Sequence, residues 1–189
     1  MKHIVALSGG KDSSALALRL DEVEPRDYTF LCTPTGDELP EMLAHWENLE
    51  CLLGKPLTRI TNGTLNGLIE EFGALPNWRQ RWCTRRLKIE PCLAYLKRNQ
   101  PAILYVGLRA DEEERQGIYS SDVACRFPLR EWGWGLAKVK NYLKERGVVI
   151  PTRTDCARCY GQRLPEWRRL LERHPEVYAE AEAQEEATG

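Results

Sequence analysis

The chain has 189 residues, of which 42% are apolar and 29% are charged. This length and balance are typical of a single globular domain with a buried core, and they argue against a chain that is mainly disordered. The formal net charge of −1 excludes a basic field over the whole molecule, so any affinity for nucleic acid must come from a local patch.

Apolar runs in the sequence are no longer than a strand, such as residues 4–7 and 102–106, so we expect no transmembrane helix and no membrane partner. The first three residues lead directly into an apolar segment, without the hydrophobic region and cleavage site of a signal peptide. We therefore expect a cytoplasmic protein. Its seven cysteines are then expected as free thiols, metal ligands or catalytic thiols rather than as disulfides.

The N-terminal half alternates strand-like and helix-like segments, which predicts a parallel sheet covered by helices. Strands are expected at residues 3–7, 28–32, 57–61 and, as the most distinct central strand, 102–107. Helices are expected at residues 13–20 and from Pro40, where an apolar stripe continues to Leu53. Further helices are expected at residues 65–72 and 84–98. Pro91 is expected to start a new turn or to kink the last of these helices.

The pattern loosens after Gly107. Residues 109–122 are polar and loop-like, and residues 148–160 look irregular around two cysteines. Helices are expected at residues 136–146, 164–173 and 175–186. Because no repeat or linker divides the chain, we expect one globular unit, with a main domain at residues 1–150 and a C-terminal extension at residues 151–189.

A glycine turn lies between the first predicted strand and the first predicted helix, where free backbone N–H groups converge and favour an anion. Its residues are Ser8, Gly9, Gly10, Lys11, Asp12 and Ser13. The glycines permit positive φ and close backbone approach, the serine hydroxyls add donors, and Lys11 supplies a positive charge for a phosphate. Neither a Walker A loop nor a G-x-G-x-x-G loop fits this spacing. We predict phosphate binding here; the alternative is a serine-capped helix after a tight turn.

This turn resembles the PP-loop of the ATP pyrophosphatases and of the phosphoadenosine phosphosulfate (PAPS) reductase family. Three further segments resemble motifs of that family in the same order: residues 35–40, residues 107–112 followed by Arg115, and residues 127–132. The chain is therefore identified as a compact, phage-type member. The resemblance implies a Rossmann-like α/β fold of the adenine nucleotide alpha hydrolase type, with a five-stranded parallel sheet, helices on both faces, and the nucleotide at the carboxyl ends of the strands.

In this family the loop holds the phosphates of ATP or the sulfate or phosphate of a sulfonucleotide. The resemblance thus assigns ATP or a related adenine nucleotide to residues 8–13 and makes residues 1–150 the PP-loop nucleotide-binding domain. Asp12 and Asp37 are the acids expected to orient Mg²⁺. Catalytic roles are expected for Lys11 and Asp12 at the phosphates and for Arg109 as a ligand of an anionic substrate group, with Arg115 as a weaker candidate.

Two cysteines at a two-residue spacing, Cys156 and Cys159, can share one metal ion, and the same spacing occurs in redox pairs and in half of a zinc site. The segment around Cys83 resembles the part of adenylyl-sulfate reductases that carries two adjacent cluster cysteines, with Thr84 in place of the second. The resemblance implies a [4Fe–4S] cluster held by Cys83, Cys156 and Cys159. A zinc ion and a metal-free thiol pair stay open as alternatives.

A cluster with three protein ligands leaves one iron open, and the resemblance to tRNA 2-thiocytidine synthetases implies that this iron carries the sulfur to be transferred. The alternative is that Cys92 or Cys125 supplies a fourth protein ligand. Cys32 and Cys51 lie in apolar strand and helix patterns and are expected to be buried structural cysteines.

Charge is unevenly distributed along the chain. Residues 79–98 carry seven Lys and Arg against one Glu, whereas the last fourteen residues carry five Glu and neither Lys nor Arg. Trp78 and Trp82 interleave with the basic residues between Arg79 and Lys88, which favours a nucleic-acid or nucleotide acceptor there. The alternative is that the tryptophans pack in the core and that the arginines face solvent or pair with the acidic tail. The histidines show no catalytic pairing and are assigned to packing or to the surface.

Three functions compete. The favoured one is ATP-dependent sulfur transfer, in which ATP adenylates an oxygen of the acceptor, pyrophosphate leaves, and sulfur from the cluster displaces AMP; it needs a sulfur donor or thiol partner. The second is sulfonucleotide reduction, in which a thiolate attacks the sulfonucleotide and sulfite is released. Sulfonucleotide reductases carry that cysteine in a C-terminal segment, and this sequence has none after Cys159. The third is nucleotide binding without catalysis. The oligomeric state stays open and is compatible with a homodimer.

Overall fold

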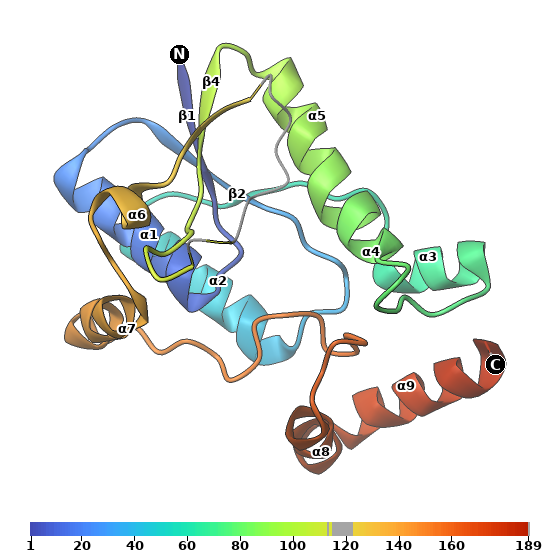
Figure 1. Ribbon diagram of the computed structural model, residues 1–189. Coiled ribbons are helices and arrows are strands. Elements are labelled where there is room, and N and C mark those ends of the chain that lie inside the picture. Colours follow the sequence, from blue (N-terminus) through green and yellow to red (C-terminus); the bar gives the residue numbers. More distant parts are fainter. Residues whose placement is uncertain (113, 115–122, 189) are drawn as a thin grey trace.

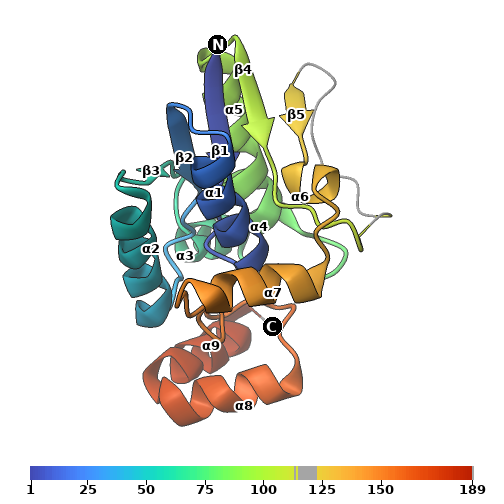
Figure 2. The same ribbon diagram turned by 90° about the vertical axis from the view of Figure 1, so that its left-hand side faces the viewer.

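The computed structural model describes residues 1–112, 114 and 123–188, and at its centre lies a five-stranded parallel sheet (Figure 1, Figure 2). The strand order is β3-β2-β1-β4-β5. The strands are β1 (Lys2–Ala6), β2 (Tyr28–Cys32), β3 (Thr58–Arg59), β4 (Ala102–Tyr105) and β5 (Ala124–Arg126). The Rossmann-like α/β fold that the sequence predicts is therefore confirmed.

β1 lies in the middle of the sheet, where Val5 pairs with Phe30 of β2 on one side and with Tyr105 of β4 on the other. All strand pairs in the described residues are parallel, so the carboxyl ends of the strands lie along one edge. The inner strands are largely buried from both faces, which explains why their sequences are apolar runs without a polar alternation.

Helices cover both faces of the sheet. On one face, α1 (Lys11–Val23), α2 (Pro40–Leu53) and α7 (Leu136–Glu145) share an apolar core with inner side chains of β1 and β2. On the other face, α5 (Glu90–Arg98) contributes the fully buried Leu96 to a second core with β1 and β4. Figure 2 shows α1 in front of the sheet and α5 behind it.

The remaining helices are α3 (Leu65–Phe72), α4 (Trp82–Thr84), the π-helix η1 (Arg85–Ile89), α6 (Pro128–Glu131), α8 (Leu164–Arg173) and α9 (Pro175–Thr188). Between η1 and α5 the Glu90 N–H donates to the Arg85 carbonyl. Pro91 follows directly and has no N–H to continue an ordinary helical ladder, which accounts for the wider turn before it. Pro91 thus lies in the first turn of a new helix, as expected.

The C-terminal segment lies at the carboxyl ends of the strands, where α8 and α9 are found in Figure 2. Residues 149–163 contain neither helix nor strand, as the sequence predicts. Ala157 and Leu170 pack with Leu39 in one apolar cluster, which joins this segment to the loop after β2. The domain boundary at residue 150 stays a prediction. Across the described residues, no helix has the length and apolar character needed to cross a membrane.

Several element boundaries differ from the prediction. α1 begins at Lys11, two residues before the expected start. β3 comprises only Thr58–Arg59 instead of residues 57–61, because it is an edge strand that pairs with β2 alone through two residues. Of the predicted loop at 109–122, residues 113 and 115–122 lie outside the described residues.

Cys51 corrects one prediction, because its side chain is exposed, whereas Cys32 is buried as expected. The reason is the helical period. Two residues after the buried Leu49 correspond to about 200° around the axis of α2, so Cys51 lies on the face opposite the apolar stripe.

A thiol reagent is therefore expected to modify Cys51 early in the folded protein and to leave Cys32 unmodified. Burial raises the pKa of Cys32 to about 12, so this thiol is neither accessible nor ionised at neutral pH. Mass spectrometry of wild type and Cys51→Ser checks this, because one fast modification should disappear in the variant. Fast labelling of Cys32 in the folded protein would contradict the burial pattern.

Candidate functional site

The predicted phosphate loop, residues 8–13, connects the carboxyl end of β1 to α1. Its serine hydroxyls hydrogen-bond within the loop: Ser8 Oγ and Ser13 Oγ lie 3.0 Å apart, and Ser13 Oγ donates to the Gly10 carbonyl oxygen at 3.1 Å. α1 starts directly after Gly10, so its first N–H groups are free of helical partners at the loop. This geometry suits an anion, as the sequence predicts.

Two side chains of α2 hold the backbone of this loop. His45 Nε2 donates to the Gly9 carbonyl oxygen at 3.0 Å, and Trp46 Nε1 donates to the Ser8 carbonyl oxygen at 3.1 Å. Burial lowers the pKa of His45, which favours the neutral ring with its hydrogen on Nε2. Sequence reasoning assigned His45 to packing or to the surface and missed this contact.

Arg109 connects Asp12 to the loop after β4. Its guanidinium donates to Asp12 Oδ2 at 2.8 Å and to Asp111 Oδ1 at 2.8 Å, and Glu112 Oε1 lies at 3.7 Å. Asp111 Oδ2 in turn accepts from the N–H of Leu136, the first residue of α7. Arg109 thus faces carboxylates here, and its predicted contact with an anionic substrate group stays a prediction. Arg115 lies outside the described residues.

Asp12 has one oxygen without a partner. Oδ2 accepts from Arg109 and lies 3.5 Å from Lys11 Nζ, whereas Oδ1 is buried and makes no hydrogen bond within the described residues. A buried carboxylate oxygen without a donor fits a ligand of a hard cation such as Mg²⁺. Gly107 makes this arrangement possible, because a Cβ there would lie 3.0 Å from the backbone carbon of Asp12.

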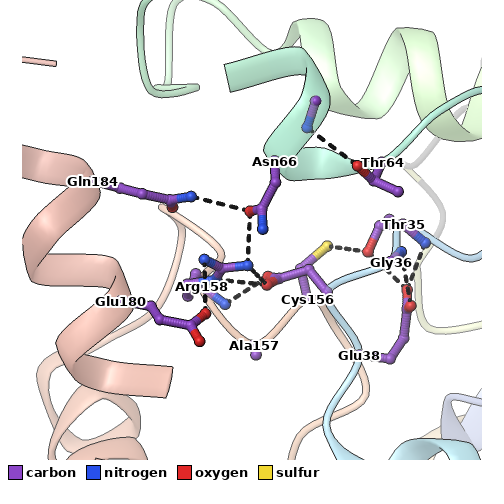
Figure 3. Close-up of polar contacts among 12 residues, drawn as sticks. Thr35, Gly36, Glu38, Thr64, Asn66, Cys156, Ala157, Arg158, Glu180 and Gln184 are labelled. Carbon is purple, nitrogen blue, oxygen red and sulfur yellow. Dashed lines mark hydrogen bonds and ion pairs between the residues drawn. The ribbon is translucent and has the colours of Figure 1, made fainter. Parts of the chain in front are cut away.

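The turn after β2 is held by Glu38. Its carboxylate accepts from the Thr35 N–H at 2.7 Å, from Thr35 Oγ1 at 2.7 Å and from the Gly36 N–H at 3.0 Å (Figure 3). Thr35 Oγ1 also lies 3.3 Å from Cys156 Sγ. The turn is therefore rigid and makes direct contact with one of the predicted cluster cysteines.

Asp37 holds the segment between Cys156 and Cys159. Its Oδ1 accepts from Arg158 Nε at 2.6 Å, its Oδ2 accepts from the Arg158 N–H at 2.9 Å, and its carbonyl oxygen accepts from the Ala157 N–H at 2.6 Å. Burial raises the pKa of Asp37, while the hydrogen bonds and charge of Arg158 act in the opposite direction. Both carboxylate oxygens have protein partners, so the contact of Asp37 with Mg²⁺ or nucleotide stays a prediction.

Arg158 extends this network to two helices. Figure 3 shows its guanidinium between Asn66 of α3, at 2.8 Å, and Glu180 of α9, at 3.3 Å. Gln184 of α9 donates to the same Asn66 side chain at 3.0 Å. The acidic tail thus pairs with Arg158 and fixes the Cys156–Cys159 turn.

The predicted cluster cysteines lie in one region of the structure. Cys83 and Cys156 pack against the same apolar cluster, which contains Leu87, and the Cys159 N–H donates to the Cys156 carbonyl. Burial raises the pKa of Cys156, and the charge of Lys88 and the Thr35 hydroxyl act in the opposite direction. In the described residues, however, no three His, Cys, Asp or Glu side chains are arranged to hold a metal ion.

Cys92 and Cys125, the alternatives for a fourth ligand, lie in a different place. Both pack against the core between α5 and the sheet, which contains Ile4 and Leu104, and not in the cluster of Cys83 and Cys156. Burial raises the pKa of Cys92 to about 11, with a further contribution from Cys125 nearby.

The two tryptophans of the basic segment have different surroundings. Trp78 is 74% exposed and meets the ring of Tyr160 edge to face at 5.3 Å, whereas Trp82 packs on Phe72 at 4.9 Å. A Cβ at Gly161 would lie 3.6 Å from Trp78 and 3.8 Å from Cys159 Sγ. Trp78 is thus an exposed ring close to a predicted cluster cysteine.

The basic residues also differ in their partners. Arg85 pairs with Glu90, and Arg86 lies near Glu71 and Glu90. Within residues 79–88, three cations have no ion pair in the described part of the chain, namely Arg79, Arg81 and Lys88. The alternative that these arginines pair with the acidic tail is not found, since the described tail contact is with Arg158.

The phosphoadenosine phosphosulfate reductase domain family matches residues 2–152. The chain is 24% identical over 193 residues to an uncharacterized protein of Methanocaldococcus jannaschii, covering 93% of this chain but only 39% of that relative. Among solved structures, it is similar to the phosphate complex of phosphoadenylyl-sulfate (PAPS) reductase from Candida auris, with a TM-score of 0.62, 16% identity, and coverage of 79% of this chain and 75% of that one. At this identity the likeness shows the fold.

Proposed function

The chain belongs to the phosphoadenosine phosphosulfate reductase domain family, and we propose that it is an enzyme that binds ATP or a related adenine nucleotide and transfers sulfur to an acceptor in an ATP-dependent reaction. The main support is the closeness of two loops. A Cβ at Gly10 would lie 3.7 Å from Thr154 Oγ1, so the segment that leads to Cys156 passes over the phosphate loop. A nucleotide at residues 8–13 would therefore lie beside the cysteine region.

The first chemical step is adenylation of the acceptor. An acceptor oxygen attacks the α-phosphorus of ATP. The bond between this phosphorus and the bridging oxygen of the β,γ-pyrophosphate breaks, and pyrophosphate leaves with the electron pair of that bond and gains negative charge. Lys11 and the free N–H groups at the start of α1 stabilise that negative charge, and Asp12 Oδ1 would hold a Mg²⁺ ion, which would add positive charge at the phosphates. Hydrosulfide from a sulfur donor then forms a bond to the activated carbon of the acceptor as the carbon–oxygen bond to AMP breaks, and AMP leaves with that oxygen.

Cys83, Cys156 and Cys159 are the residues that would hold an iron–sulfur cluster, and their side chains would have to move together to do so, because no such group of three is formed in the described residues. A bound cluster would supply an exchangeable sulfur or an electron. Thiolates are the ligands that such clusters use, and zinc would use the same set. Ligation requires the half-buried Cys156 thiol to lose its proton. Burial raises the pKa of Cys156 and opposes this loss, whereas Lys88 and Thr35 act in the opposite direction.

The acceptor is proposed to be a nucleotide or nucleic acid that binds at Trp78. This ring is exposed, and Arg79, Arg81 and Lys88 in the same segment have no carboxylate partner in the described residues. An exposed ring with unpaired cations suits a base with its phosphate. A homodimer stays a prediction.

Trp78→Ala is expected to weaken binding of a single-stranded oligonucleotide about tenfold, because stacking of one base contributes about 1–3 kcal/mol. Fluorescence anisotropy of a labelled oligonucleotide measures the Kd. Trp78→Phe is the matched control, since a phenyl ring keeps a stacking face and should retain most of the affinity. Equal Kd values for wild type and Trp78→Ala would remove Trp78 from the acceptor site.

Sulfonucleotide reduction is the second candidate, and the match to the phosphoadenosine phosphosulfate reductase domain over residues 2–152 favours it. In that reaction a thiolate attacks the sulfur of the sulfonucleotide, the nucleotide phosphate leaves, and a second thiol releases sulfite. Nucleotide binding without catalysis is the third candidate.

Pyrophosphate release distinguishes these functions. After anaerobic reconstitution with iron and sulfide, the protein is incubated with ATP and candidate acceptors, and with PAPS in parallel. Acceptor-stimulated pyrophosphate release supports the sulfur-transfer proposal, sulfite from PAPS overturns it in favour of reduction, and binding of ATP without either product leaves only the non-catalytic function.

Two substitutions should separate the nucleotide site from the cysteine site. Lys11→Ala is expected to weaken ATP binding about tenfold or more, through loss of a charge-assisted contact of about 1.5–3 kcal/mol, and to leave the iron content unchanged. Cys156→Ala should lower the iron content and leave ATP binding unchanged. Lys144→Ala, on the exposed side of α7, is the control. Loss of both properties in each variant would contradict the division of roles.

A further inference from the structure

A cavity of about 490 Å³ lies between the N-terminal half of α2, residues 149–153 and α8. It is separate from the phosphate-loop residues, none of which lines it. Leu39, Ala44, Ile150 and Leu170 form apolar walls, and arginines of α8 lie at its polar edge. This volume falls within the range of small-molecule sites, about 300–1,000 Å³.

The charge of the lining is unbalanced in favour of cations. Both lining acids have partners, because Glu166 accepts from Arg153 at 3.0 Å and Glu41 lies 3.0 Å from His174 Nε2. Arg169 donates through Nε only to a backbone carbonyl of its own helix.

Arg173, in the last turn of α8, forms no ion pair in the part of the chain that the structure describes. Two guanidinium groups, those of Arg169 and Arg173, therefore line this cavity without an ion pair in the described residues; the Glu166 carboxylate, which is paired with Arg153, is close enough for the charge of Arg169 to act on it. Guanidinium groups of this kind bind carboxylates, sulfonates and phosphates.

Two lining side chains also hold the candidate functional site. His45 lines the cavity and donates to the Gly9 carbonyl of the phosphate loop at 3.0 Å. Arg153 lines it as well and donates to the Cys156 carbonyl at 3.1 Å. A molecule in the cavity would thus touch one of the side chains that hold the phosphate-loop backbone and one that holds the cysteine turn.

We propose that this cavity is a second ligand site, which takes a small anion with an apolar body, and that its occupancy is linked to nucleotide binding through His45. The apolar walls take the body of the ligand, and Arg169 and Arg173 take its anionic group. The site itself is independent of the function proposed above, whereas the linkage rests on nucleotide binding at residues 8–13. Linkage is reciprocal, so each ligand changes the affinity of the other by the same factor.

The probe 1-anilinonaphthalene-8-sulfonate has this chemistry, with two aromatic units and one sulfonate. Wild-type protein is expected to bind it with enhanced fluorescence at one saturable site. Ala44→Trp, which fills the cavity, and the double variant Arg169→Glu/Arg173→Glu are each expected to raise its Kd at least tenfold. Circular dichroism and thermal melts establish that each variant is folded.

Two controls separate this cavity from other surfaces. Arg168→Glu makes the same kind of substitution on α8, at a side chain that is 80% exposed and does not line the cavity. This variant should leave the Kd of the probe unchanged. Ala181→Trp fills a second cavity, between α3 and α9, and should also leave it unchanged. Absence of saturable binding, an unchanged Kd in Ala44→Trp, or loss of binding in Ala181→Trp would overturn the site.

The linkage is tested with ATP, whose own binding is measured separately by calorimetry. Saturating ATP is expected to change the Kd of the probe at least twofold, and His45→Gln should reduce this change. If ATP binds and the Kd of the probe is the same with and without it, the linkage is overturned. If ATP does not bind at all, the proposed function and the linkage both fail, and the probe titration still decides the site.

Discussion

Asp37→Ala is expected to lower the free energy of unfolding by about 3–5 kcal/mol, the usual cost of removing one partner from a buried ion pair. The side chains of Asp37 and Arg158 are only 3% and 7% exposed, so the guanidinium would be left buried without its main acceptor. Urea unfolding followed by circular dichroism gives the free energy directly.

Glu180→Ala is the matched control for this prediction, because Glu180 contacts the same guanidinium at 3.3 Å but is 62% exposed. An exposed ion pair contributes about 0–1 kcal/mol, so this variant should be nearly as stable as wild type. Equal losses in the two variants would show that burial does not decide the energetics here.

The same substitution tests the sequence-based role of Asp37. If the carboxylate serves mainly to hold the Cys156–Cys159 turn, Asp37→Ala should destabilise the protein and speed alkylation of the half-buried Cys156. A nucleotide or Mg²⁺ ligand without a structural role would instead weaken ATP binding at unchanged stability. Stability and Cys156 alkylation therefore change in the first case, whereas only ATP binding changes in the second.

Local patterns in the sequence predicted a parallel sheet covered by helices, and the resemblance to the PAPS reductase family supplied its five strands. α3 and α8 have the predicted boundaries because their apolar residues recur with the helical period, and β2 because its apolar run ends at a polar turn. The place of residues 8–13 between a strand and a helix was also predictable from local features, and phosphate binding there stays a prediction.

Contacts between distant residues were not predictable in this way. Asp37 meets Arg158 across 121 positions and His45 meets the Gly9 carbonyl across 36. No local pattern distinguishes an acid that binds a cation from one that holds a neighbouring loop. One feature of the sequence indicated that His45 is buried, namely its position beside Trp46 in the apolar stripe of α2.

The cysteines include positions that the sequence predicted correctly and one that it did not. Resemblance grouped Cys83 with Cys156, and the fold brings both to one apolar cluster, whereas Cys92 and Cys125 lie in another core. Cys51 was misassigned because an apolar neighbourhood in the sequence does not give the face of the helix. The face on which a residue lies is found only from its angle around the helix axis, measured from the buried residues.

Gly9→Ala is expected to lower the free energy of unfolding by about 2–5 kcal/mol and to abolish phosphate binding at residues 8–13. The residue has a φ of 84°, a conformation that costs an alanine about 1–2 kcal/mol. Its Cβ would also lie 2.2 Å from Met42 Cε and 2.6 Å from Trp46 Nε1, and overpacking of this kind costs about 1–3 kcal/mol.

Two other glycines separate these contributions. Gly54 has a φ of 61° and open space at its Cβ position, so Gly54→Ala should lose only the backbone part, about 1–2 kcal/mol. Gly10 has a φ of −68° and its nearest neighbour at 3.5 Å, so Gly10→Ala should be close to wild type in stability. Trp46 must move to admit a Cβ at Gly9, and its hydrogen bond to the Ser8 carbonyl is then lost. The loop backbone therefore shifts, and calorimetry should detect no pyrophosphate binding in Gly9→Ala; binding at the wild-type affinity would mean that α2 does not position this loop.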